Sequence, residues 1–233
     1  MRVLIIKLTS MGDLMHALPA LTDASKKIPN IEFDWVVDEN FSEVVEDLKN
    51  AGKIPSIKEC VYFSDEKCPS SMHNFESLID NNKPIEDALR SYDDIAGLFY
   101  TGGTTGRSKG VMLTHTNLVA NSFNTITALN IQKDPHWLHA APMFHIADGL
   151  AVFGVTMVTG VHIFIPAFAP EDSLKAIEEH KVSHGLFVPT MMNALINHPD
   201  IEKYDLSSLD SVAYGAAPMP EAVIRRAMEI IPN

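Results

Sequence analysis

The sequence is poor in cysteine and in basic residues. Only two cysteines occur among 233 residues, Cys60 and Cys68, and neither belongs to a CxxC pair or to a His/Cys cluster with metal-ligand spacing. The sequence therefore indicates no disulfide framework and assigns no metal ligand, and we expect two reduced thiols in a cytoplasmic protein. Lys and Arg number 18 against 30 Asp and Glu, a formal net charge of −12. A chain with this charge lacks the excess of Lys and Arg needed to neutralise many phosphates at once. We therefore expect no nucleic-acid partner and no attachment to an anionic membrane.

The sequence also lacks a convincing secretion signal or membrane span. The opening MRVLII is too short for a signal peptide, and the polar LTSMGD follows at once. Segment 149–170 contains no Asp, Glu, Lys or Arg, and its length approaches that of a bilayer span. Gly154, Gly160 and Pro166 interrupt it, however, and the β-branched run VHIFI follows Gly160. We therefore expect a buried helix, a turn and a buried strand, with a membrane span as the less favoured alternative.

Short β-rich runs alternate with amphipathic helical stretches along the chain, and apolar residues make up 46% of the sequence. This alternation predicts an α/β fold, a layered parallel or mixed sheet flanked by helices, and we expect one such sheet from residue 95 onward. The predicted strands are 3–6, 32–37, 58–63, 95–100, 137–141, 161–165, 184–188 and 211–214. The predicted helices are 14–27, 41–50, 117–130, 150–159, 172–180, 191–197 and 220–230.

A glycine-rich loop follows the apolar run IAGLFY. Segment 100–110 reads YTGGTTGRSKG, with four glycines, three threonines and one lysine. Glycines let backbone N–H groups approach an anion, and hydroxyls and a lysine add donors for phosphate. The spacing of Gly106 and Lys109 does not fit the GxxxxGK[ST] loop. The residues favour a nucleotide-phosphate loop, with a flexible surface turn as the alternative; the candidate binding residues are Thr101, Gly102, Gly103, Thr104, Thr105, Gly106 and Lys109.

This loop resembles the signature loop of the adenylate-forming superfamily, which includes acyl-CoA synthetases, luciferases and peptide-synthetase adenylation domains. Ser108 stands where that family usually has proline, a change that would loosen the turn before Lys109. Three later segments are similar to further family motifs in order and separation: APMFHIADG at 141–149, FVPTM at 187–191 and YGAAPM at 214–219. The resemblance covers residues 41–233 and implies a partial AMP-binding acyl-CoA synthetase domain.

The resemblance also implies roles for individual residues. Lys109 and the threonines of the loop would hold the phosphates of ATP, and His145 would lie near the acyl and thiol pockets, so Lys109 and His145 are the candidate catalytic pair. The adenine would lie along Gly215, Ala216, Ala217 and Pro218. On the residues alone, a histidine in the position of His145 is more often a satisfied core residue than a catalytic one. Likewise, 215–218 fits a plain turn before a helix.

The reaction implied by the family has two steps, in which a carboxylic acid reacts with ATP and a thiol such as CoA then displaces AMP. ATP and Mg²⁺ are the implied cofactors, CoA a co-substrate, and a fatty acid the leading substrate class. The family segments that carry the Mg²⁺-associated glutamate, the ribose-binding aspartate and the adenylation lysine do not occur in the 233 residues. We therefore expect this truncated chain to be inactive in adenylation, and its exposed apolar surface to favour a homodimer.

Residues 1–40 resemble a different family, the N-terminus of lipopolysaccharide heptosyltransferase I, a two-domain GT-B enzyme. The pattern predicts a Rossmann-like β-α-β unit. Asp13 matches that family's proposed general base, although an aspartate at the start of a helix is the preferred explanation. The chain is thus interpreted as a chimera, with a heptosyltransferase-like segment at 1–40 and the adenylate-forming part at 41–233. The alternative functions are a heptosyltransferase remnant, a non-catalytic nucleotide-binding module and a decayed product.

Overall fold

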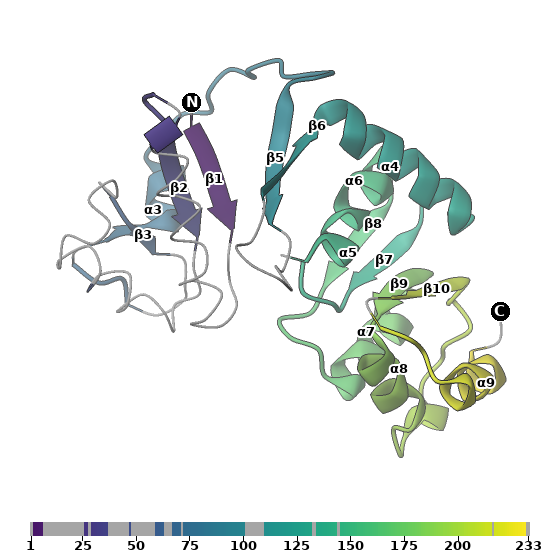
Figure 1. Ribbon diagram of the computed structural model, residues 1–233. Helices are drawn as coiled ribbons and strands as arrows, with labels where there is room; N and C mark the ends of the chain where they lie inside the picture. The colour runs from purple at the N-terminus through teal and green to yellow at the C-terminus, as the bar shows by residue number, and fades with distance from the viewer. Residues whose placement is uncertain are drawn as a thin grey trace. The chain divides into compact units, whose positions relative to one another are not determined.

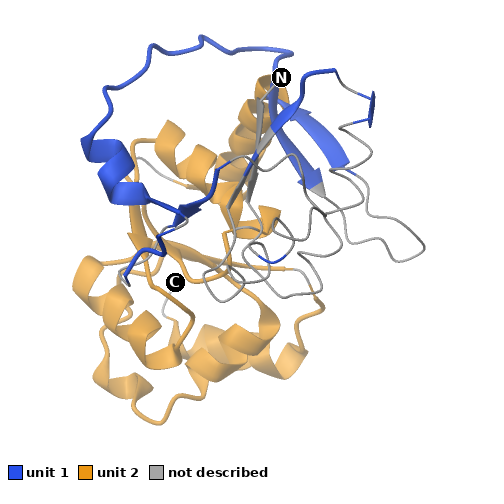
Figure 2. Ribbon diagram, turned by 90° about the vertical axis from the view of Figure 1, so that its left-hand side faces the viewer, with its two compact units in different colours: residues 1–114 blue, residues 115–233 orange. Residues whose placement is uncertain are grey.

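The computed structural model describes residues 2–6, 26–27, 29–36, 47, 59–62, 67–70, 72–100, 110–131, 134–143, 145–215 and 217–231. The chain separates into two compact units, residues 1–114 and 115–233, each of which is considered by itself (Figure 2). The predicted phosphate-loop residues 101–109, Asp13 and Ala216 lie outside the described residues. Their roles therefore stay predictions.

The first unit begins with a parallel pair of strands. Strand β1 (Arg2–Ile6) pairs with β2 (Glu32–Val36) in the register Arg2↔Glu32 to Ile6↔Val36. Parallel neighbours need a crossover of about a dozen residues or more, which the intervening chain provides. Both strands were predicted, at 3–6 and 32–37. Of the predicted helix 14–27, residues 26–27 are described, and they are helical.

The middle of this unit is described in part, and of the predicted helix 41–50 the described residue, Asp47, is helical. The strand expected at 58–63 is described as the two-residue β3 (Val61–Tyr62), which pairs with β4 (His73–Asn74). Helix α3 (Phe75–Asp80) follows and was not predicted. Its start is set by Asn74, whose side chain accepts a hydrogen bond from the backbone N–H of Ser77 at 2.9 Å. Such an N-cap satisfies one of the orphan donors of the first turn, so a local polar signal defines this helix.

The third pair of strands in this unit corrects the expected single sheet from residue 95 onward. Strand β5 (Ile95–Tyr100) pairs antiparallel with β6 (Gly110–Thr114), whereas the later strands form a sheet of their own in the second unit. Strand β5 was predicted within its observed bounds, and β6 was missed. Tyr100 and Gly110 are Cα partners, so the two residues that flank segment 101–109 lie side by side.

The second unit contains a four-stranded parallel sheet in the order β10-β9-β7-β8 (Figure 1). The strands are β7 (His136–His139), β8 (Val161–Phe164), β9 (His184–Phe187) and β10 (Ser211–Tyr214). The helices are α4 (His115–Ala128), α5 (Ile146–Gly149), α6 (Ala151–Met157), α7 (Pro170–His180), α8 (Pro189–Ile196) and α9 (Glu221–Ile230), with a short 3₁₀ turn η2 (Ile201–Lys203). This layered α/β unit confirms the predicted fold class.

Side chains of successive strand residues point to opposite faces of this sheet and build two cores. Trp137 of β7 packs with Ile131, Ala151 and Val155, on the face covered by α4 and α6. Its neighbour Leu138 faces the larger core on the side of α7 and α8 (Figure 1). Each fully buried Leu, Ile, Val or Phe side chain stabilises the fold by about 1.5–3 kcal/mol relative to an exposed one. The sheet is therefore a rigid support for the loops at its ends.

Proline positions two of these helices. Pro170 and Pro189 each occupy the first turn of a helix, where a missing N–H costs nothing and the fixed φ suits the helix, so α7 and α8 begin about two residues before the predicted starts. The charge-free segment 149–170 contains α6, a turn and β8 in the predicted order, but β8 is not the buried strand that was expected, because its Val161 and Phe164 are exposed. Within the described ranges, no helix combines the length and apolarity that crossing a bilayer requires.

Candidate functional site

The predicted site segments of the second unit follow the ends of its strands. Segment 141–149 follows β7, Pro189 follows β9, and Gly215 follows β10. All pairings in this sheet are parallel, so the carboxyl ends of these strands lie along one edge. In open α/β sheets, ligands bind outside this edge. The structure thus brings His145 and Gly215 to the same edge.

The topology singles out one position on this edge. The chain leaves β7 through α6, on the face of Trp137, and leaves β9 through α8, on the face of Leu138. Strands β7 and β9 are neighbours, with Leu138 paired to Gly185. The connections therefore depart to opposite faces from adjacent strands, which is the topological switch point at which such sheets bind nucleotides and substrates. His145 follows one of these two strands and Pro189 the other.

His145 lies on a compact turn and is itself exposed. It caps the start of α5, and its backbone N–H donates to the carbonyl of Pro142 at 3.0 Å. The N–H of Gly149 in turn donates to the carbonyl of His145 at 3.0 Å. A Cβ at Gly149 would lie 2.5 Å from the carbonyl oxygen of Met143. The turn therefore closes on itself through backbone contacts that a larger residue at Gly149 would disturb.

A buried polar network lies beneath this turn. The carboxylate of Asp148 accepts a hydrogen bond from Nε1 of Trp137 at 3.1 Å and another from Nδ1 of His139 at 3.0 Å. The side chains of Asp148 and His139 are both 0% exposed. Nε2 of His139 lies 2.9 Å from Nδ1 of His162, and Nε2 of His162 lies 3.0 Å from the hydroxyl of Thr156 on α6. Sequence reasoning assigned no role to these residues.

Two histidines of this sheet are electrostatically perturbed. Burial, and then the neighbouring imidazole of His139, lower the pKa of His162 from its usual value, and Asp148 opposes this shift. Burial also lowers the pKa of His184, against the weaker influence of Asp210. The buried Nε2 of His184 has no hydrogen-bond partner among the described residues. Both imidazoles are thus favoured in their neutral forms.

The described residues include no group of three or more His, Cys, Asp or Glu side chains placed to hold a metal ion. The Asp148 network is accordingly a set of hydrogen bonds.

The segment after β10 is open. Ala217 and Pro218 are exposed, and a Cβ added at Gly215 would meet no heavy atom within 4 Å. The backbone at Gly215 is therefore accessible to a flat ring such as adenine, so this position fits the predicted contact. The described residues of this segment are Gly215, Ala217 and Pro218. They do not test the predicted contact with adenine, which stays a prediction.

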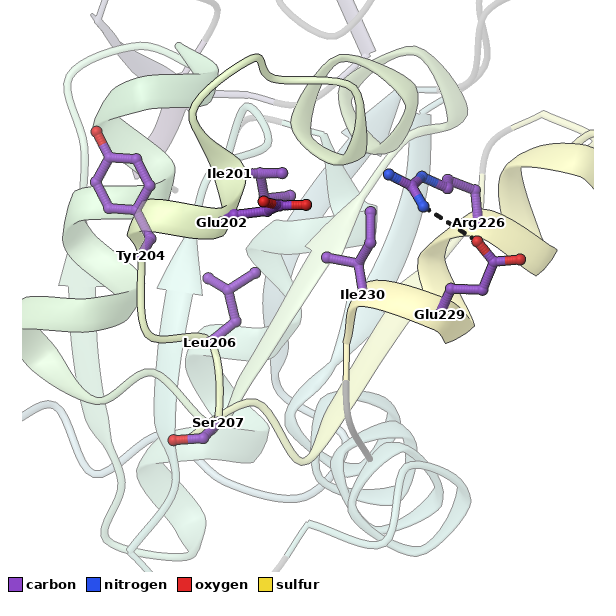
Figure 3. A pocket seen from close by; sticks show the side chains of 8 residues that line it. All are labelled: Ile201, Glu202, Tyr204, Leu206, Ser207, Arg226, Glu229 and Ile230. Carbon is purple, nitrogen blue, oxygen red and sulfur yellow. Dashed lines mark hydrogen bonds and ion pairs between the residues drawn. The ribbon is translucent and has the colours of Figure 1, made fainter.

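A pocket of about 340 Å³ lies elsewhere in this unit (Figure 3). Its η2 residues precede β10, and Ile230 ends α9, so it lies toward the amino ends of the strands. Arg226, the cation at its rim, is already paired with Glu229 at 3.1 Å. The pocket is therefore separate from the predicted site edge. It is lined by Ile201, Glu202, Tyr204, Leu206, Ser207, Arg226, Glu229 and Ile230.

Known proteins resemble this chain in sequence. Feruloyl-CoA synthase of Amycolatopsis sp is 39% identical over 138 residues, which cover 59% of this chain and 28% of that protein. The long-chain-fatty-acid–CoA ligase of Bacillus subtilis is 36% identical over 160 residues, covering 66% and 29%. Acyl-CoA synthetase 7 of Caenorhabditis elegans is 29% identical over 235 residues, covering 90% and 42%. The chain thus spans well under half the length of these relatives.

Solved structures resemble this chain in fold. The luciferase-like enzyme of the mealworm Zophobas morio has a TM-score of 0.70 at 19% identity, covering 99% of this chain and 57% of that one. The o-succinylbenzoate CoA synthetase of Bacillus subtilis, in complex with its acyl-adenylate intermediate, has a TM-score of 0.68 at 21% identity, covering 98% and 59%. The same enzyme in complex with ATP and magnesium ion has a TM-score of 0.66 at 21% identity, covering 98% and 47%.

The match to the family itself covers most of the chain. It extends over residues 22–233 and begins inside the segment 1–40 that resembles a heptosyltransferase, so the boundary at residue 40 and the chimera stay predictions. The extent of this match and the shared fold lead to one assignment: the chain belongs to the AMP-binding enzyme family.

Proposed function

We propose that the chain is part of an ATP-dependent acyl-CoA synthetase. In the first step, a carboxylate oxygen attacks the α-phosphorus of ATP and pyrophosphate leaves. In the second, the sulfur of CoA attacks the acyl carbonyl carbon of the adenylate and AMP leaves. The family match over residues 22–233, which includes the glycine-rich loop, carries this proposal.

The chain's own residues would bind and orient the nucleotide. Lys109 supplies a point charge for phosphate, and the threonine hydroxyls and backbone N–H groups of 101–106 supply further donors. The pairing of Tyr100 with Gly110 supports this role, since it brings the flanks of the loop together. Gly215 and its neighbours would contact the adenine, and His145 would lie at the switch point beside the acyl and thiol groups. Mg²⁺ would bind together with the phosphates of ATP.

The substrate would be a small carboxylic acid, with a fatty acid as the leading class. Relatives at similar identity are named for ferulate and for long-chain fatty acids, so an aryl acid is the competing class. Two alternatives predict different behaviour. A non-catalytic nucleotide-binding module binds ATP without releasing pyrophosphate when an acid is added. A heptosyltransferase remnant binds a sugar nucleotide through Asp13. A homodimer formed through exposed apolar surface would be compatible with the proposed function and with both alternatives.

The test is a thermal melt of the 233-residue chain with and without MgATP. A ligand of the native state raises the melting temperature by mass action, so we expect ATP to raise it and Lys109→Ala to remove the rise. Lys83→Ala, at an exposed lysine of the same unit, is the matched control and should retain it. Pyrophosphate release should be very slow for this chain alone but should depend on the added acid, whereas a non-catalytic nucleotide-binding module would show no such dependence. A melt indifferent to ATP, or a response that depends on Asp13, contradicts the proposal.

A further inference from the structure

The turn that carries His145 is held to the sheet in an unusual way. Its described residues Pro142, Met143, His145, Ile146 and Ala147 are exposed, so these five side chains make little apolar contact with the core. Of the four residues of α5, all of them described, Asp148 is the only buried one. A helix of one turn is marginal by itself and depends on packing for its place. Among the described residues of this turn, the buried carboxylate of Asp148 makes the contact with the sheet that apolar side chains make elsewhere in the unit.

The hydrogen bonds of that carboxylate fix a direction through the network. An ionised carboxylate accepts only, so Nδ1 of His139 must donate to Asp148, and Nε2 of His139 is left to accept. Nδ1 of His162 then donates to His139, and Nε2 of His162 accepts from the hydroxyl of Thr156. Every position is satisfied with both imidazoles neutral. For neutral rings, an ionised Asp148 is therefore compatible with one tautomer of each histidine.

The network connects the turn to three elements at once. Trp137 and His139 belong to β7, His162 to β8, and Thr156 to α6. The rings of His139 and His162 are also nearly parallel, with centroids 5.1 Å apart and 20° between their planes. Movement of Asp148 would therefore disturb hydrogen bonds made by β7, β8 and α6.

We propose that Asp148 is a positioning residue, which holds the His145 turn at the carboxyl ends of β7 and β9 so that His145 faces the acyl group of the adenylate. The statement that His145 meets the acyl group rests on the proposed function. The fixing of the turn by Asp148 does not, because it follows from the hydrogen bonds and burial. The ligand chemistry is that of an acyl group linked to AMP.

The first readout needs no ligand. Side-chain spectra of nitrogen-labelled histidine in the 233-residue chain report the environment of His145, which His145→Gln assigns. We expect Asp148→Asn, which keeps the shape but loses the charge, to move the His145 signals. Glu179→Gln, the same chemical change at an exposed residue of α7, should leave them in place. If Asp148→Asn leaves the His145 signals unchanged, the positioning role is wrong, whether or not the chain binds nucleotide.

The second readout uses an unreactive acyl-adenylate analogue, a sulfamoyl adenosine that carries a lauroyl or a cinnamoyl group. We expect Asp148→Asn and His145→Ala each to weaken its binding about tenfold and the double variant to weaken it no further, because two residues acting through one contact are not additive. AMP alone should bind all four proteins equally. Losses that multiply in the double variant would overturn the proposal. If the unmodified chain binds neither analogue nor AMP, the proposed function fails, and the histidine spectra still decide the role of Asp148.

Where Asp148→Asn does not fold, His139→Gln offers a second variant, because it removes one of the two donors to Asp148 and leaves the carboxylate. We expect it to move the His145 signals in the same direction by a smaller amount. Unchanged His145 signals in this variant would also contradict the proposal.

Discussion

The turn after β7 and the segment after β10 lie on the same edge of one sheet and are built on opposite principles. The first is fixed from within, by a buried carboxylate and by backbone hydrogen bonds around His145. The second is open: Gly215 has empty space where a side chain would be, and Ala217 and Pro218 are exposed. The difference indicates that the chain itself sets the place of His145, whereas the adenine-side segment would gain its contacts from the nucleotide.

Among the variants that test this contrast, Asp148→Ala is expected to have the largest effect on stability. The change leaves Nε1 of Trp137 and Nδ1 of His139 buried without an acceptor. Unpaired buried donors cost about 1–3 kcal/mol each, so we expect the free energy of unfolding to fall by about 3 kcal/mol. Urea denaturation measures it, followed by tryptophan fluorescence in a Trp35→Phe background, where Trp137 is the one remaining tryptophan. Ala217→Ser on the open segment is the control, and a loss of similar size there would remove the contrast.

A matched pair of glycine substitutions gives a smaller effect. In Gly149→Ala the new Cβ would lie 2.5 Å from the carbonyl oxygen of Met143, which is backbone and cannot swing away. We expect a loss of about 1–3 kcal/mol, the range for overpacking. In Gly215→Ala the Cβ meets nothing within 4 Å, so stability should change by less than about 1 kcal/mol.

The same pair also separates stability from binding. The new methyl group at residue 215 would occupy space proposed for adenine, so Gly215→Ala should reduce the thermal shift with ATP. Denaturation and ATP-dependent melts of both variants check this. Equal losses of stability in the two variants would show that both segments are packed alike.

The smallest expected effect is a dependence on pH. The pKa values of His162 and His184 are lowered in the folded protein from 6.5, so the unfolded chain takes up protons first as pH falls. Their contribution to stability is therefore fully present above pH 6.5 and is lost as pH falls below it. We expect a lower melting temperature at pH 5.5 than at pH 7.5, with a flatter profile in the double variant His162→Gln/His184→Gln. An unchanged slope would show that other groups set it.

Sequence patterns were enough for most of the second unit. Its four strands were predicted to within about two residues, because apolar runs between turn residues leave few alternatives. Strand β6 was missed since its five residues GVMLT show no alternation of polar and apolar residues. Helix α5 was missed for a different reason: it presents no apolar face, and its anchor is a carboxylate. Periodicity reports apolar burial and cannot detect an element that is held by polar contacts.

The site was predicted in the same uneven way. His145 and Gly215 were placed by resemblance, and the parallel strands bring both to one edge. The partnership of Asp148, His139 and His162 could not be predicted, because it depends on the register of β7 and β8. That register pairs Trp137 with His162, and it sets His139 diagonally across from His162. The available signal was the spacing of Trp137 and His139, two residues on one face of one strand, followed by a carboxylate in an otherwise apolar segment.

The order β10-β9-β7-β8 leaves two edge strands in the part of the chain that the structure describes. An edge strand presents backbone N–H and C=O groups to any extended peptide that approaches, and the edge strand β8 carries the exposed side chains Val161 and Phe164. Strand addition at such edges is how sheets grow into larger sheets, and it is equally how unrelated chains adhere to one another. The two borders of the described sheet are therefore the positions at which a further strand would pair.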